Sequence, residues 1–74
     1  MKVDFQKLQI AMANACMNKG DLAVAAGISR ISVSKYFSGQ RRPSPKTIGR
    51  IAKALNVSVT DIIENTAATV DNGR

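Results

Sequence analysis

The most informative segment of the chain spans residues 19–38 and reads KGDLAVAAGISRISVSKYFS. Its pattern predicts two helices of about eight residues, at 19–26 and 30–37. Gly27 is expected to end the first helix in the left-handed conformation, which glycine adopts at low cost. Ser29 is the expected N-cap of the second helix. The segment therefore predicts two short helices joined by a tight turn.

Apolar spacing predicts which faces of these two helices are buried. Ala23 must be small because the second helix crosses close above it, and Ile28 and Val33 fill the junction. The expected inner positions are Leu22, Ala23, Ala26, Val33, Tyr36 and Phe37. The positions left outside are Arg30, Ile31, Ser34 and Lys35. This arrangement is typical of a helix-turn-helix, whose second helix enters the major groove of DNA by its N-terminal end.

Three further helices are predicted outside this segment. One covers residues 4–15, with apolar residues at helical spacing. Another begins after Ser44 with Pro45 at its first position, where a missing N–H costs nothing, and ends at Asn56. The last covers residues 59–65 and opens on a capping-box spacing.

The expected fold class is all-α. A compact five-helix domain covers residues 1–65, with the helix-turn-helix at 19–38, and residues 66–74 form a disordered tail. The sequence shows no strand pattern longer than a few residues, no internal repeat and no second domain. At 74 residues the domain buries only about 60% of its unfolded surface, which predicts modest stability.

Charge is distributed unevenly along the chain. The net charge is +6, and no acidic residue lies between Leu22 and Thr60. That stretch holds seven basic residues, namely Arg30, Lys35, Arg41, Arg42, Lys46, Arg50 and Lys53. A block of one sign attracts polyanions, although a solvated basic face without a partner fits the composition equally well.

Several function classes are disfavoured by composition. The chain has no histidine and one cysteine, Cys16, so a zinc site, a disulfide framework and histidine-based catalysis are not expected. There is no glycine-rich phosphate loop, and we expect no enzyme activity, no metal and no cofactor. No apolar run approaches the roughly 20 residues of a membrane span, and the N-terminus lacks a secretory signal pattern. A cytoplasmic protein of bacterial or phage origin fits these facts.

Motifs in order along the chain resemble a known family. They are Leu22-Ala23, Ala26-Gly27-Ile28-Ser29, Val33-Ser34-Lys35-Tyr36, Ser38-Gly39, Arg42-Pro43-Ser44 and Ile51-Ala52-Lys53-Ala54-Leu55-Asn56-Val57-Ser58. Together they resemble the Cro and phage-repressor family of helix-turn-helix regulators, over about residues 8–63, and Gly27 to Lys35 also resembles the headpiece of the lac repressor family. The resemblance implies a five-helix, lambda-repressor-like domain that forms a homodimer and binds a palindromic operator.

One position pair departs from the family. Many members pair an arginine in the first helix with a glutamate at the end of the third, and the matching residues here are Met12 and Phe37. Replacing both halves of a buried ion pair by apolar residues is often neutral or stabilising. The departure leaves the predicted fold intact.

The residues expected to contact bases are Arg30, Ile31, Ser34 and Lys35. Arginine pairs with guanine O6 and N7, and isoleucine suits a thymine methyl group. Alternatives stay open: Arg30, Ser34 and Lys35 could bind phosphates instead, and Ile31 could pack against the preceding helix.

The residues expected to contact phosphates are Lys19, Ser29, Ser32, Gln40, Arg41, Arg42 and Lys46. Lys19 is the first residue of a helix whose N-terminal N–H groups favour an anion. The primary role expected for Ser29 is to cap the following helix. A solvated lysine and a charged surface loop are the alternatives for these side chains.

Val59 and Ile62 are the expected dimer contacts, because the resemblance places the dimer interface in the fifth helix. The alternative is that Val57 and Ile63 fill the core while Val59 and Ile62 are singly exposed. The expected partner is double-stranded DNA, with no small-molecule effector, and repression is favoured over activation. The rival functions are an antitoxin or accessory regulator that also binds a protein, and a pure protein-interaction module on the same fold.

Overall fold

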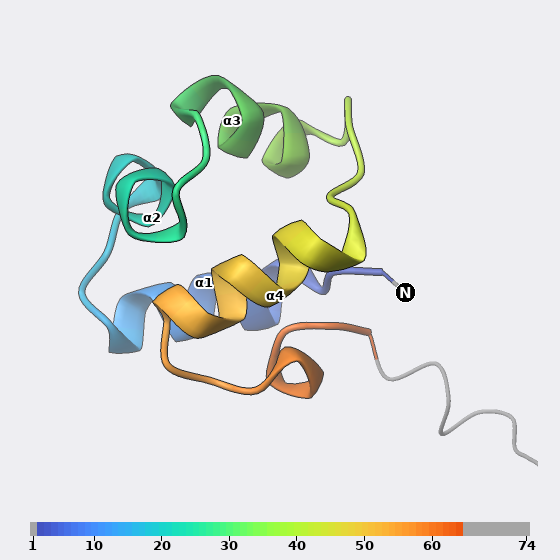
Figure 1. The fold of residues 1–74 in the computed structure, drawn as a ribbon. Coiled ribbons are helices and arrows are strands. Elements are labelled where there is room, and N and C mark those ends of the chain that lie inside the picture. Colours follow the sequence, from blue (N-terminus) through green and yellow to red (C-terminus); the bar gives the residue numbers. More distant parts are fainter. Residues whose placement is uncertain (1, 65–74) are drawn as a thin grey trace, which may run out of the picture.

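The computed structural model describes residues 2–64 of the chain. Four α-helices follow one another: α1 (Phe5–Asn14), α2 (Lys19–Ala26), α3 (Arg30–Ser38) and α4 (Pro45–Ala54) (Figure 1). A short 3-10 helix, η1 (Val59–Asp61), follows them. The fold is all-α, as predicted, and the boundaries of α1 to α4 agree with the expected ones to within one or two residues. The predicted tail at 66–74 lies outside the described residues.

The fifth helix was predicted too long. Only the three residues of η1 are helical, and Ile62 then leaves the helix with φ −125°. Ile63 forms an isolated antiparallel bridge with Val3, and the amide of Asp4 donates to the carbonyl of Ile62 over 2.9 Å. Pairing with the N-terminal segment thus replaces the helix that a capping-box spacing predicted, because backbone groups beyond residue 61 find partners there.

The helix ends follow the local signals in the sequence. Asn18 and Asp21 form a reciprocal capping box at the start of α2, and the Ser44 hydroxyl accepts from the amide of Thr47 at the start of α4. Asn56, where the fourth helix was predicted to end, has φ +57° and is left-handed. Cys16, for which no such conformation was expected, has φ +58° directly after α1 and is exposed.

The core lies between α1, α2 and α4 and receives side chains from all four helices and from the segment after η1. Its five most completely buried large side chains are Leu8, Leu22, Val33, Ile48 and Ile62. α2 packs against both α3 and α4, while α3 lies at one edge of the molecule (Figure 1). The inner side of α3 is therefore anchored on α2, and its outer side is left free.

Candidate nucleic-acid interface

The turn between α2 and α3 is closed by backbone hydrogen bonds. The Ile28 amide donates to the carbonyl of Ala23 over 3.0 Å, and Gly27 takes φ +70° as the left-handed C-cap of α2. The Ser29 hydroxyl then accepts from the amide of Ser32 over 3.0 Å and starts α3. These hydrogen bonds hold the start of α3 close to the end of α2.

α3 has one buried and one exposed side, as the apolar spacing predicted. Val33 is 1% exposed and Tyr36 is 8% exposed, whereas Ile31 is 68% exposed. Arg30 and Ser34 are exposed, and Lys35 is half-buried. One exposed apolar side chain is ordinary on a protein surface. What distinguishes Ile31 is its place on α3, where Arg30 and Lys35 are its neighbours.

Six of the predicted contact residues share one shallow surface on the outer side of α3. We call it the α3 hollow; its volume is about 480 Å³, and it is lined by Lys19, Arg30, Ile31, Ser34, Lys35, Ser38 and Gln40. Three of these side chains are cationic and none is acidic, so the hollow favours anions. The hollow joins the start of α2 to the far end of α3.

Ser38 belongs to this surface but was not among the predicted contacts. Its hydroxyl donates to the carbonyl of Lys35 over 3.1 Å. Its position four residues after Ser34 is the signal that could have identified it, because such residues share a helix face.

A second group of predicted residues meets at the first turn of α3. The Ser29 hydroxyl donates to that of Ser32 over 2.9 Å, and Arg41 Nη1 donates to the Ser32 hydroxyl over 3.5 Å. The loop after α3 brings Arg41 back, since the amides of Gln40 and Arg41 both donate to the carbonyl of Lys35. Ser29 acts as an N-cap, and the hydroxyl of Ser32 already has partners within the chain.

Arg42 and Lys46 are exposed but lie outside the α3 hollow. Arg42 borders a smaller hollow of about 180 Å³, together with Lys2, Phe5, Tyr36, Arg41 and others. Lys2, a cation that was not among the predicted contacts, also lines this smaller hollow. The pairing of the N-terminal segment with residues 62–64 positions it there. Lys46 lies in the first turn of α4, after the Ser44 cap.

Ile62 is not on the surface, contrary to its prediction as a dimer contact. It is 0% exposed within the single chain, while Val59, Val57 and Ile63 are half-buried. The end of η1 at Asp61 turns the Ile62 side chain inward, where it completes the core beside α4. Ile62 therefore has no side-chain surface left for a partner, and Val59 alone remains available at this position.

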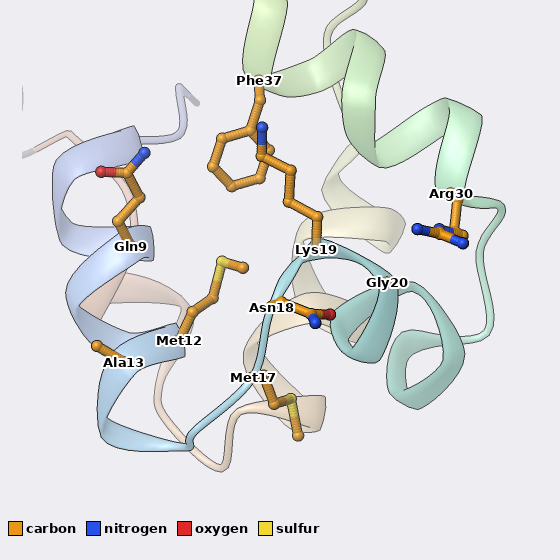
Figure 2. A pocket seen from close by; sticks show the side chains of 9 residues that line it. All are labelled: Gln9, Met12, Ala13, Met17, Asn18, Lys19, Gly20, Arg30 and Phe37. Carbon is orange, nitrogen blue, oxygen red and sulfur yellow. The ribbon is translucent and has the colours of Figure 1, made fainter.

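Met12 and Phe37, the pair that departs from the family pattern, lie at one hollow between α1 and the start of α2. Met12 is 6% exposed and Phe37 is half-buried. The hollow has a volume of about 560 Å³ and is also bordered by Lys19 and Arg30 (Figure 2).

The comparisons with known proteins agree with this geometry. A family model described as helix-turn-helix matches residues 17–62, which include α2, α3, α4 and η1. The chain belongs to this helix-turn-helix family, of the Cro and phage-repressor type. It is therefore a DNA-binding transcriptional regulator, a class that is not enzymatic. No curated protein and no solved structure matches the chain.

Two further findings concern residues 2–64. No helix in this range is long and apolar enough to cross a bilayer. Within the same range, no three His, Cys, Asp or Glu side chains gather where they could hold a metal ion.

Proposed function

We propose that this chain is a sequence-specific repressor that inserts α3 into the major groove of a palindromic operator. The observation that carries the proposal is the α3 hollow, where cations surround the exposed Ile31 on a helix anchored by its opposite side. An α-helix fits the major groove of B-DNA, where each base pair has a distinct pattern of donors and acceptors. Exposed basic and apolar side chains on one such helix suit that pattern.

Bases are contacted from the first turns of α3. Arg30, at the first helical position, donates to O6 and N7 of a guanine, and Ile31 packs on a thymine methyl group. Lys35 and Ser34 lie farther along the same hollow and supply further donors to base edges.

Phosphates are contacted from both ends of α3 and from the flanking segments. The contributing residues are Lys19, Ser29, Ser32, Gln40, Arg41, Arg42 and Lys46. Arg41 serves through its position over Ser32 at the start of α3, where the helix N-terminus also favours an anion. These contacts set the register of α3 on the duplex without specifying sequence.

A homodimer places two copies of α3 in successive major grooves, about 34 Å apart on one face of the DNA. Val59 contributes to the dimer contact, while Ile62 remains in the core of each protomer. Repression follows from occupying the site of RNA polymerase, and DNA as the partner implies a cytoplasmic location.

Selection of bound sites from a random DNA pool, at stated salt, tests the proposal. The expected result is a short motif with two-fold symmetry, bound at least about 10³-fold more tightly than a scrambled duplex. Equal affinity for the selected and scrambled duplexes would overturn sequence specificity. A selected motif without symmetry, bound by one protein copy, would overturn the palindromic operator.

A further inference from the structure

The ammonium group of Lys19 lies over the ring of Phe37. Its Nζ is 4.7 Å from the ring centroid, within the range of a cation–π interaction. Figure 2 shows the Lys19 side chain extending from the start of α2 to the ring at the end of α3. A lysine that would otherwise sample many rotamers thus has a defined direction.

The Phe37 ring also packs against a second aromatic ring. Its centroid is 5.1 Å from that of Phe5, with the two planes tilted by 58°. Phe5 begins α1, so one aromatic pair joins α1 to α3 and supports a cation from α2. The position of the Lys19 ammonium therefore depends on the packing of three helices.

Lys19 occupies a position that suits an anion. It is the first residue of α2, where the helix dipole favours negative charge and the amides of Lys19 and Gly20 take no part in the Asn18–Asp21 capping box. It also lines the α3 hollow together with Arg30. An ammonium group has three donors, and contact with a ring face leaves donors available for a phosphate oxygen.

We propose that Phe37 is a positioning residue for DNA binding, which holds Lys19 in place for a backbone phosphate at the start of α2. The inference rests on the proposed function, since it names a determinant of the same DNA contact. Holding the side chain before binding reduces the rotamer entropy that is lost when lysine contacts phosphate. Phe37 thereby contributes to affinity without touching DNA.

A double-mutant cycle tests this role on the selected duplex. Phe37→Leu is expected to weaken binding about two- to fivefold in the parent chain, the size of an exposed cation–π interaction. In a Lys19→Met background the same substitution is expected to have no effect, because no ammonium group remains to be held. Phe37→Tyr, which keeps the ring face, should retain the parent affinity.

Lys53→Met provides the matched control, because Lys53 lies on α4 away from the α3 hollow. Phe37→Leu should keep its full effect in that background. An equal loss of affinity in the Lys19→Met and Lys53→Met backgrounds would show that Phe37 only supports the fold, and would overturn the inference.

A measurement without DNA separates this inference from the proposed function. In the parent protein, ring current should shift the ε-methylene protons of Lys19 upfield relative to those of Lys53 in NMR spectra. Lys19 shifts equal to those of Lys53 would overturn the inference even if Phe37→Leu failed to fold. Shifted Lys19 protons in a chain without preference for any duplex would instead reject the proposed function alone.

Discussion

Arg30 lies against Gly20, at a place where a larger residue would crowd it. A Cβ atom built on Gly20 would be 3.3 Å from Nε and 3.5 Å from Cζ of Arg30. Figure 2 shows the guanidinium group turned from α3 toward the first turn of α2. Because Gly20 has no side chain, the guanidinium group of Arg30 can lie between α2 and α3.

Arg30→Ala is expected to weaken binding to the best site by about 1–3 kcal/mol and to relax specificity at one base position. The reason is the loss of the proposed bidentate contact between the guanidinium group and guanine. Titrations against the best site and its single-base variants measure the effect. Uniform weakening on every duplex would instead assign Arg30 to a phosphate.

Arg42→Ala is expected to lower affinity evenly across sequences. Loss of one phosphate contact should reduce the slope of log K against log salt by about 0.9, because one counterion fewer is released. Binding isotherms at four or more salt concentrations measure the slope. A slope equal to that of the parent protein would contradict a phosphate contact by Arg42.

Gly27→Ala is expected to destabilise the fold by about 1–2 kcal/mol, the cost of a left-handed conformation for a residue with a Cβ atom. The added methyl group would meet no atom within 4 Å, so the cost comes from the backbone at φ +70° rather than from a clash. Chemical denaturation measures it. Gly27→Asn is the control and should cost less, because asparagine tolerates this conformation better. Equal stability of parent and Gly27→Ala would refute the argument.

Ile62→Val is expected to cost about 0.5–1.5 kcal/mol of folding stability, as for the loss of a buried methyl group from a core. Because Ile62 is 0% exposed within one chain, the cost should be the same at low and high protein concentration. Denaturation at two concentrations, with sedimentation to follow the oligomeric state, makes the comparison. If Ile62→Val changed the monomer–dimer equilibrium, Ile62 would be part of the dimer interface after all.

Much of the functional segment could be predicted because its signals are local. Gly27 and Ser29 act on their own backbone, and the apolar spacing of α3 separates Val33 from Ile31 within a single helix. The end of the domain could not be predicted in the same way. The capping arrangement of Ser58 and Asp61 is present, yet the helix it would start stops after η1. A contact with Val3, more than fifty residues away in sequence, prevails there.

The sequence by itself determined α1 to α4, their caps, the tight turn and the outward side of α3, because each depends on neighbours within one or two helical turns. The tertiary structure alone decided how side chains from different helices meet. It brought Lys19 to Phe37, placed Arg30 beside Gly20 and buried Ile62 in the core. Such contacts depend on how the helices cross and on which backbone groups still need hydrogen-bond partners. The spacing of residues along the chain contains no information about either.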